Sequence, residues 1–331
     1  MIRCFALSLF ALATLAFGSA MPALAQEDAI KIGVIGLDTS HSPAFARAMN
    51  ERAVEAGKRP VRVVAAYPYG SSQIESSASR IPKFTEDFKA MGIEIVDSID
   101  ALLAKVDGVL LETNDGTLRK EQFAKILAAK KPVFADKPAA ATWEDTLWIY
   151  RQAEAAGLPI FSASSLRYQP TAEDLSPDTV GEIVGADSYS PCSMEPHHSR
   201  LYWYGIHGVE TLFTIMGPGC ESVSCTATDG TDLAVGRWAG DRIGTFRGIR
   251  KGKADYGGTI YGTKAIRTLG KYPGYAPLVV AIEDFFRTGK SPVSNQETLE
   301  IYAFMEAARL SAERGGAPVS IAELFAIDVA K

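Results

Sequence analysis

A lysine and a histidine of this chain stand in sequence contexts that suit acid–base chemistry. Residues 132–138 read Pro-Val-Phe-Ala-Asp-Lys-Pro, so Lys137 directly follows a short apolar stretch and precedes a proline. If that stretch is a strand of a parallel sheet, Lys137 lies at the carboxyl edge, where open α/β folds bind ligands. His207 lies in a second polar segment, and an imidazole near a lysine suits proton transfer at neutral pH. We therefore predict that Lys137 and His207 are catalytic. The plainer interpretation is a surface lysine and a core histidine.

Metal binding is an alternative for the segment around His207. Three of the four histidines of the chain lie within residues 197–207. A glutamate follows His207 by three positions, so the two side chains share one face of a helix. Imidazoles and carboxylates are common zinc ligands. The candidate ligands are His197, His198, His207 and Glu210. A third interpretation is that these histidines are hydrogen bonded in a core of aromatic residues.

The first predicted turn resembles the start of a dinucleotide-binding domain. It reads Gly-Val-Ile-Gly-Leu-Asp-Thr-Ser-His and ends at His41. Such turns normally read Gly-x-Gly-x-x-Gly, where the second glycine admits the diphosphate and the third lets helix and strand pack closely. Gly36 holds the first place, but Asp38 and His41 hold the second and third. Thr39 and Ser40 still offer hydroxyl and backbone N–H groups at a helix N-terminus. The alternative is that Asp38, Thr39 and Ser40 only cap the helix.

The end of the second predicted strand lacks an acidic residue. That strand covers residues 61–66 and is followed by Tyr-Pro-Tyr-Gly. Dinucleotide sites usually place an aspartate or glutamate there to bind the ribose hydroxyls. Tyr67 and Tyr69 would either stack on a ring or fill a loop.

The elements that must position these residues alternate between strand and helix over residues 30–162. The short runs are rich in Val and Ile and are apolar nearly throughout, as is typical of strands buried on both faces. They cover residues 30–35, 61–66, 108–113, 132–135 and 159–163. Helical patterns lie near residues 42–56, 98–105, 117–130 and 141–157. This alternation predicts a doubly wound parallel sheet of the Rossmann type.

The pattern changes after about residue 166. A helical stretch at 203–216 is followed by consecutive strand patterns, separated by turn signals such as Asp229-Gly230. These strands cover residues 221–229, 231–238, 242–250 and 255–263, and two helices follow at 276–288 and 295–313. Ser294 or Asn295 would cap the last helix. Consecutive strands favour an open antiparallel sheet in an α+β domain. We expect a Rossmann-type domain over residues 26–165 and the α+β domain over 166–331.

The first 25 residues have the features of a secretory signal peptide. Arg3 precedes an apolar run at 5–17, which is shorter than the roughly 20 residues that span a bilayer. Ala23-Leu24-Ala25 has the form of a cleavage site. We expect cleavage after Ala25 and a periplasmic or secreted protein; an uncleaved anchor is the alternative.

Charge and cysteine content narrow the choice of partners. The net charge is −5 and the chain has no basic run, so we expect no nucleic acid as partner. After signal cleavage, no segment is apolar enough for us to expect a membrane partner. Cys192, Cys220 and Cys225 would form one disulfide or remain buried thiols.

Taken in order, these features resemble the Gfo/Idh/MocA family, named for glucose–fructose oxidoreductase and inositol dehydrogenase. The Ala-Asp-Lys-Pro stretch around Lys137 is similar to the family's Glu-Lys-Pro motif. Residues 204–210 are similar to its Gly-x-His-x-x-Asp helix, and Ser-Ser-Leu-Arg-Tyr at 164–168 matches the segment that leads into the second domain. The resemblance covers essentially the whole mature chain. It implies a Rossmann domain, an open antiparallel sheet, an active site between them and a homo-oligomer packed through the sheet.

The resemblance also implies a reaction, namely hydride transfer between NAD or NADP and a hydroxyl-bearing carbon of a carbohydrate or polyol. Lys137 would polarise the reacting hydroxyl, and His207 would take or return its proton. The implied cofactor contacts are Gly36, Asp38, Thr39, Ser40, His41, Thr113, Asn114 and Asp136. The implied substrate contacts are Arg167, His197, His198, Tyr204 and Glu210.

Departures from the family pattern keep a second function open. Trp203 stands four residues before His207, where the family usually has aspartate, and residues 113–116 read Thr-Asn-Asp-Gly in place of a Thr-Pro-Asn loop. A chain exported unfolded would also lose a cofactor bound beforehand. The first predicted function is an exported oxidoreductase with bound NAD or NADP. The second is a family member without the dinucleotide that is a carbohydrate hydrolase or lyase, with a metal at the histidine cluster, or a binding protein.

Overall fold

The computed structural model of the protein describes residues 28–171 and 173–329, so the predicted signal peptide lies outside the described residues. The N-terminal half contains β1 (Ile30–Ile35), α2 (His41–Glu51), β2 (Val61–Tyr67), α3 (Glu75–Ala78), α4 (Ile81–Ala90), β3 (Glu94–Ile95), α5 (Ile99–Leu103), β4 (Gly108–Leu111), η1 (Gly116–Leu118), α6 (Arg119–Ala128), β5 (Val133–Ala135), α7 (Trp143–Ala155), β6 (Ile160–Phe161) and η2 (Ser165–Tyr168). The C-terminal half contains β7 (Ile183–Pro191), α8 (Ile206–Met216), β8 (Cys220–Ala227), β9 (Thr231–Trp238), β10 (Arg242–Ile249), β11 (Gly257–Gly262), β12 (Ile266–Thr268), α9 (Ala276–Thr288), α10 (Asn295–Glu313), β13 (Val319–Ser320) and α11 (Ile321–Phe325).

The first sheet confirms the predicted doubly wound Rossmann architecture. Its six strands follow the order β3-β2-β1-β4-β5-β6, and all of its strand pairs are parallel. All four residues of β4 are buried, as expected for a strand with helices on both faces. Because the order reverses beside β1, the carboxyl ends of β1 and β4 open onto the crevice where such folds bind ligands.

The second sheet is mixed, which corrects the predicted antiparallel sheet. Its order is β12-β11-β7-β10-β9-β8-β13, and β7 pairs with β10 in parallel. The sequence pattern missed β7, because its nine residues include Gly, Asp, Ser and Pro and lack a clean apolar alternation. Chain order alone therefore suggested a simple meander, whereas β7 inserts between β11 and β10.

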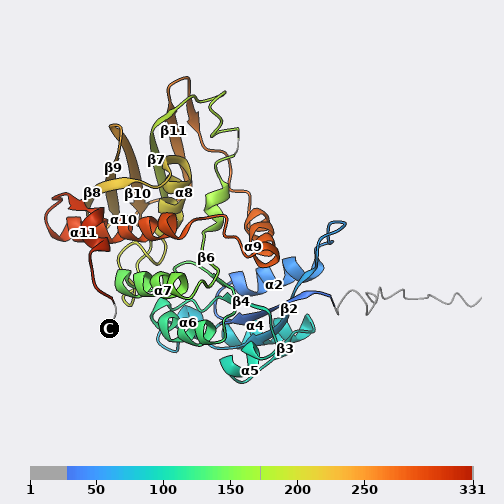
Figure 1. The fold of residues 1–331 in the computed structure, drawn as a ribbon. Coiled ribbons are helices and arrows are strands. Elements are labelled where there is room, and N and C mark those ends of the chain that lie inside the picture. Colours follow the sequence, from blue (N-terminus) through green and yellow to red (C-terminus); the bar gives the residue numbers. More distant parts are fainter. Residues whose placement is uncertain (1–27, 172, 330–331) are drawn as a thin grey trace, which may run out of the picture.

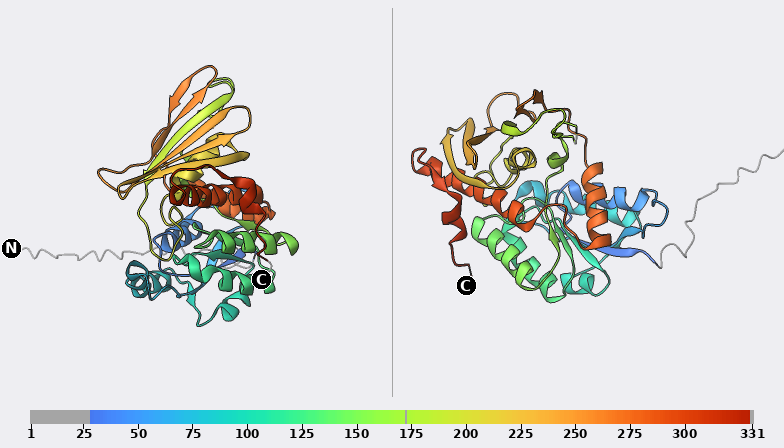
Figure 2. Two further views of the ribbon diagram at one scale, coloured as in Figure 1. Left: turned by 90° about the vertical axis from the view of Figure 1, so that its left-hand side faces the viewer. Right: turned by 45° about the horizontal axis from the view of Figure 1, so that its top comes forward.

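Helices from the C-terminal half join the two sheets. α8 and α10 lie on one face of the second sheet (Figures 1 and 2), and α10 also contacts α7 of the first domain. α9 packs on α2, and Leu278 and Ile282 share a core cluster with β1 residues such as Ile32 and Val34. The C-terminal half thus completes the packing of the Rossmann sheet and holds the two sheets together.

A capping residue in the sequence accounts for the start of α10. Ser294 caps α10, since its Oγ accepts a hydrogen bond from the Glu297 N–H at 3.1 Å.

Cys192, Cys220 and Cys225 are all buried free thiols. Within the described ranges, no helix is both long and apolar enough to cross a bilayer.

Candidate functional site

A cavity of about 280 Å³ lies where the carboxyl ends of the first sheet meet the second domain. We call it the central cavity. It is lined by Thr39, Ser40, His41, Ser76, Arg80, Asn114, Lys137, Ser165, Leu166, Trp203, Tyr204, His207, Tyr256, Tyr272 and Tyr275. Sites for drug-sized ligands have volumes of roughly 300–1,000 Å³. The central cavity is therefore sized for a small ligand, and its many hydroxyl, amide and charged groups suit a polar one.

Lys137 reaches the central cavity from the end of β5. Its side chain is largely buried, and its Nζ lies 5.8 Å from the centroid of the Tyr204 ring. An aromatic face attracts the ammonium group without neutralising its charge. The structure therefore places a positively charged hydrogen-bond donor where the sequence predicted one.

His207 reaches the same cavity from the first turn of α8. Its Nδ1 lies 2.7 Å from Ser164 Oγ, and the rings of Tyr204 and Tyr256 contact it edge-on. Burial, followed by the charge of nearby Lys137, lowers the pKa of His207 well below its usual value. His207 is thus an uncharged imidazole at neutral pH. The two predicted catalytic residues line one cavity.

His41 forms a buried pair with Asp136. Its Nδ1 lies 2.7 Å from Asp136 Oδ2, and its ring packs between Phe45 and Tyr275, with centroids 5.3 and 5.0 Å away. Burial alone would raise the pKa of Asp136, but the charge and hydrogen bond of His41 lower that pKa to about 2. The residue at the third glycine position of the turn is therefore half of a histidine–carboxylate pair at the cavity wall.

The first turn keeps only part of its dinucleotide-binding form. Gly36 has a φ of +97°, and a Cβ there would lie 2.4 Å from the Thr113 backbone nitrogen, so the first glycine keeps its role. Asp38 is fully buried and does not cap α2, since its Oδ1 accepts a hydrogen bond from the Asn114 N–H at 3.0 Å. Burial raises the pKa of Asp38 to about 6. The backbone N–H of His41, the first residue of α2, donates a hydrogen bond to Thr39 Oγ1 at 3.4 Å. Thr39 is therefore the hydroxyl residue that comes closest to capping this helix.

Residues 70–80, which we call the cover segment, lie directly on Asp38. A Cβ on Gly70 would come within 2.7 Å of Asp38 Oδ2. Ser77 is fully buried beside the same carboxyl group, and its Oγ accepts a hydrogen bond from Asn114 Nδ2 at 3.2 Å. The cover segment thereby connects the first turn to the loop after β4. Rossmann domains hold the diphosphate and adenosine across this crevice. Tyr67 and Tyr69 line a separate cavity of about 170 Å³ at the end of β2. The residues present therefore fit a dinucleotide beside Lys137, whereas the buried Asp38 occupies the place of the second glycine.

A group of ionisable side chains lies below the central cavity. Burial, and then the nearby Asp136, raise the pKa of Glu112 well above its usual value. Arg119 donates hydrogen bonds to the backbone oxygens of Thr113 and Asp136. His41, Glu112 and Asp136 offer atoms within 4.8 Å of one another that could hold a metal. Because Nδ1 of His41 is hydrogen bonded to Asp136, we interpret the group as an acid–base cluster.

Two predicted substrate residues lie elsewhere. Arg167 Nε is 3.3 Å from Glu210 Oε1, and the guanidinium group also bonds Glu297. Burial raises the pKa of Glu210 to about 7 despite the opposing charge of Arg167. Neither Arg167 nor Glu210 lines the central cavity. They form an interior ion pair between η2, α8 and α10.

The histidines at 197 and 198 also lie outside the central cavity. His197 is exposed, and its Nδ1 lies 2.8 Å from Glu195 Oε1. His198 Nε2 accepts a hydrogen bond from the Gly116 N–H at 2.9 Å, and burial lowers the pKa of His198 to about 4. The four residues of the alternative metal site make these separate contacts. The structure does not bring His197, His198, His207 and Glu210 together as one ligand set.

Sequence reasoning missed most of the aromatic wall. Tyr256, Tyr272 and Tyr275 line the central cavity from segments that flank β11 and precede α9. Ser165 Oγ lies 2.7 Å from the Tyr272 hydroxyl, which fixes that ring. The available signal was three tyrosines in glycine- and proline-rich loops. Trp203, in the place of the family's aspartate, also lines the cavity.

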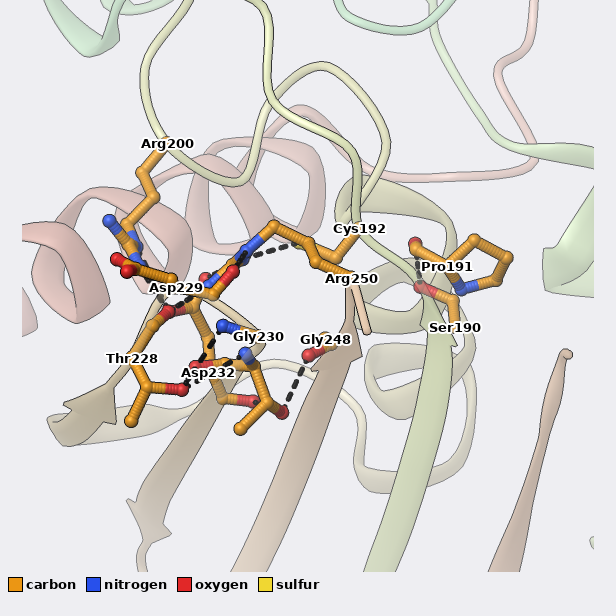
Figure 3. A network of polar contacts seen from close by, with 11 residues as sticks. Ser190, Pro191, Cys192, Arg200, Thr228, Asp229, Gly230, Asp232, Gly248 and Arg250 are labelled. Atoms are coloured by element: carbon orange, nitrogen blue, oxygen red, sulfur yellow. Dashed lines mark hydrogen bonds and ion pairs between the residues drawn. The ribbon is translucent and has the colours of Figure 1, made fainter. Parts of the chain in front are cut away.

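The loop between β7 and α8 is anchored by a buried carboxylate (Figure 3). Asp232, fully buried on β9, lies 2.7 Å from Arg200 of this loop and 2.6 Å from Arg250. Arg250 also contacts Cys192 Sγ at 3.7 Å. Because the loop continues into Trp203, this network helps to fix the wall of the central cavity.

The fold and the site together define a two-domain protein with a Rossmann domain and a ligand cavity at its carboxyl edge. Residues 30–164 match the family model named GFO_IDH_MocA, described as an oxidoreductase family with an NAD-binding Rossmann fold. This N-terminal domain therefore matches the Rossmann domain of the Gfo/Idh/MocA family, which the sequence motifs also resemble. A sequence search of the curated proteins gives no match.

Solved structures share the whole architecture. Scyllo-inositol dehydrogenase from Lactobacillus casei, determined with NAD(H) and scyllo-inositol, has a TM-score of 0.68 and 16% identity, and the alignment covers 89% of this chain and 99% of that one. An oxidoreductase from Agrobacterium radiobacter, in complex with NAD⁺, L-tartaric acid and magnesium, has a TM-score of 0.71 and 15% identity. The alignment again covers 89% of this chain and 99% of that one. An oxidoreductase from Thermotoga maritima gives 0.70 and 19%, again over 89% and 99%. At these identities the likeness establishes the fold.

Proposed function

We propose that the protein is an exported oxidoreductase that acts on a hydroxyl group of a small polyol or sugar in the central cavity. The observation that carries this proposal is that Lys137 and His207, from different domains, line one small polar cavity. The inositol dehydrogenase among the similar structures supports a polyol as the first substrate class to test.

The chain's own residues supply binding and acid–base chemistry. The ammonium group of Lys137 donates a hydrogen bond to the hydroxyl oxygen and stabilises negative charge as the proton leaves. An imidazole of the cavity wall takes that proton. NAD or NADP, when bound, supplies the acceptor for the hydride on the same carbon. Lys137 and His41 would contact its nicotinamide end, and Thr39 and Ser40, at the N-terminus of α2, would offer hydroxyl and N–H groups to its phosphates.

A second candidate is a carbohydrate hydrolase or lyase without the dinucleotide. One specific observation favours it: the buried carboxyl group of Asp38, packed against the cover segment, stands where a dinucleotide-binding turn has its second glycine. Both candidates need acid–base groups at the ligand, and Lys137, His41 and His207 of the central cavity supply them.

Analysis of the native protein discriminates between the two candidates. The mature protein is purified from its native compartment and denatured, and the supernatant is examined for NAD(P) by mass spectrometry and for metals by elemental analysis. Released NAD(P), or reduction of added NAD⁺ with scyllo-inositol or myo-inositol, supports the oxidoreductase. A protein that releases no dinucleotide and binds none on titration excludes it.

Substitution of the lysine tests the site itself. We expect Lys137→Ala to lower kcat by roughly 10²-fold or more, the scale of losing one charged transition-state donor. Lys125→Ala, an exposed lysine on α6, is the matched control. Full activity in Lys137→Ala, with the control unchanged, would refute the assignment of this cavity as the active site.

Export and assembly complete the proposal. The signal sequence supports cleavage after Ala25, which N-terminal sequencing of the protein from the periplasm or culture medium tests directly. The face of the second sheet opposite α8 carries exposed apolar side chains, including Ile243 and Tyr189, which supports a homo-oligomer packed through that sheet.

A further inference from the structure

We propose that His41, held by Asp136, is the residue that takes the proton from the ligand's hydroxyl group, and that His207 acts as a hydrogen-bond donor to the same oxygen. This inference deepens the proposed function and rests on a hydroxyl-bearing ligand binding in the central cavity. It assigns a catalytic role to a residue that the sequence placed only in the cofactor turn.

The contact with Asp136 fixes the tautomer of His41. A carboxylate accepts hydrogen bonds, so at 2.7 Å from Asp136 Oδ2 the Nδ1 atom carries a proton. In neutral His41 the lone pair is then on Nε2. Within the described residues Nε2 has no hydrogen-bond partner, and His41 lines the central cavity. Stacking on Phe45 and the edge contact with Tyr275 hold the ring in place.

The same reasoning gives His207 the opposite tautomer, with its ring proton on Nε2. Ser164 Oγ already accepts a hydrogen bond from the Leu166 N–H at 3.1 Å, and its own hydroxyl proton needs an acceptor. Nδ1 of His207, 2.7 Å away, is that acceptor, so the ring proton of His207 is on Nε2. His207 has no carboxylate in contact, and Lys137 is close by, so an imidazolium there would be buried beside a like charge. His207 is suited to donate a hydrogen bond and poorly suited to accept a proton.

His41, in contrast, has a carboxylate in direct contact with its ring. The ionisable groups packed around it are Asp136 and Lys137 after β5, Glu112 after β4, Asp38 in the turn, Tyr275 before α9 and His207 on α8. Asp136 is the carboxylate in hydrogen-bond contact with the His41 ring, so it is the group that neutralises an imidazolium there. Charge-assisted hydrogen bonds of this kind are about twice as strong as neutral ones.

The proton-transfer step balances without any other reactant. The hydroxyl proton moves to Nε2 of His41, and the electron pair of the O–H bond stays on the ligand oxygen. The imidazolium keeps its Nδ1–H bond to the Asp136 carboxylate. Lys137 and the Nε2–H of His207 donate hydrogen bonds to the resulting oxyanion. Asp136 acts through His41 and is a positioning residue.

Chemical labelling tests the assigned tautomers of His41 and His207 without a substrate. Diethyl pyrocarbonate acylates an unprotonated imidazole nitrogen, and peptide mass spectrometry locates the label. We expect label on His41 in the full-length mature protein, slower labelling of His41 in Asp136→Asn, and little label on His207. His197, which pairs with Glu195 outside the cavity, is the internal control and labels equally in both proteins. Label on His207 with His41 unreactive would overturn the proposal.

Kinetics supply the second readout, with scyllo-inositol or myo-inositol and NAD⁺ as probes. We expect His41→Gln and Asp136→Asn to lower kcat by about 10²- to 10⁴-fold, as for loss of a general base, with little change in KM. His41→Gln should also lose the fall in kcat at low pH, whereas His207→Gln should retain it. His197→Gln should match the wild type. Retention of that fall in His41→Gln, or its loss in His207→Gln, would contradict the assignment. If neither polyol is turned over, the proposed substrate class fails, and the labelling result still decides the role of His41.

Discussion

At the scale of single residues, the buried carboxyl group of Asp38 carries an electrostatic cost near the site. Its carboxyl group is fully buried, and burial raises its pKa from 3.8 to about 6. An acid whose pKa is higher in the folded state binds more protons folded than unfolded between these two values, so stability falls as the pH rises through that window. Above about pH 6 the cost is complete, at about 3 kcal/mol for a shift of this size.

Asp38→Asn is therefore expected to stabilise the protein in a pH-dependent way. The amide oxygen can still accept the Asn114 N–H bond, while the buried charge is removed. The gain in unfolding free energy should be near zero at about pH 4, grow to about pH 6 and then stay constant at up to about 3 kcal/mol. Urea denaturation of both proteins at several pH values measures it. Asp97→Asn, an exposed aspartate, is the control. An equal effect at all pH values would contradict the burial argument.

The sequence predicted the chemistry of single residues better than their partners. The cavity positions of Lys137, His207 and Tyr204 followed from motif and strand-end arguments, because neighbours in sequence fix where a strand or helix ends. The pairing of His41 with Asp136 joins residues 95 positions apart, and Arg167 with Glu297 joins residues 130 apart. Such contacts depend on tertiary packing, which one sequence does not encode locally.

At the scale of elements, the cover segment packs over the carboxyl group of Asp38 beside the dinucleotide crevice. It is held by the packing of Gly70 on Asp38 and by the bond from Asn114 to Ser77. Its helix α3 was not predicted from the sequence, because residues 71–80 are dominated by serines and lack a long apolar period. The parallel strands were predicted well because double burial leaves a continuous apolar run.

Loosening the cover segment should increase dinucleotide affinity. The double variant Asp38→Gly/Ser77→Ala removes the carboxylate from the diphosphate position and one anchoring bond. We expect the Kd for NADH to fall by about tenfold, equivalent to about 1.4 kcal/mol. Fluorescence titration measures the affinity, and hydrogen exchange of residues 70–80 reports whether the segment moves. Glu75→Gln, exposed on the same segment, should have no effect. Unchanged affinity together with unchanged exchange would show that the segment does not restrict this site.

In the second domain, the Asp232 network (Figure 3) holds the loop that continues into the wall of the central cavity. Asp232→Ala would leave Arg250, which is mostly buried, without its carboxylate partner. Breaking a buried ion pair by removing one partner typically costs about 3–5 kcal/mol. We expect a loss on this scale in chemical denaturation, accompanied by higher proteolytic sensitivity of the loop at 192–205. Asp229→Ala, exposed in the neighbouring turn, should change neither quantity, and equal losses in both variants would argue against the ion-pair explanation.

At the scale of the whole molecule, the two sheets serve different purposes. The Rossmann sheet has helices on both faces, and α9 returns from the C-terminal half to complete that cover. The second sheet is covered by α8 and α10 on one face only (Figure 2), and Figures 1 and 2 show no described helix over the other. The central cavity lies on the covered side, and residues of a single chain line it.

Because the open face and the central cavity lie on opposite sides of the second sheet, assembly and ligand binding can be tested separately. Ile243, on β10, is 51% exposed on the open face, so a charge there should disrupt an oligomer that packs through the sheet without altering the cavity. We expect Ile243→Asp to convert the native oligomer to a monomer in size-exclusion chromatography with light scattering, while ligand binding is retained. Met194→Asp, 48% exposed in the loop after β7, should leave the mass unchanged. A wild-type monomer, or an Ile243→Asp protein of unchanged oligomeric mass, would contradict assembly through this face. Loss of ligand binding in a folded Ile243→Asp monomer would instead show that the cavity depends on the assembled state.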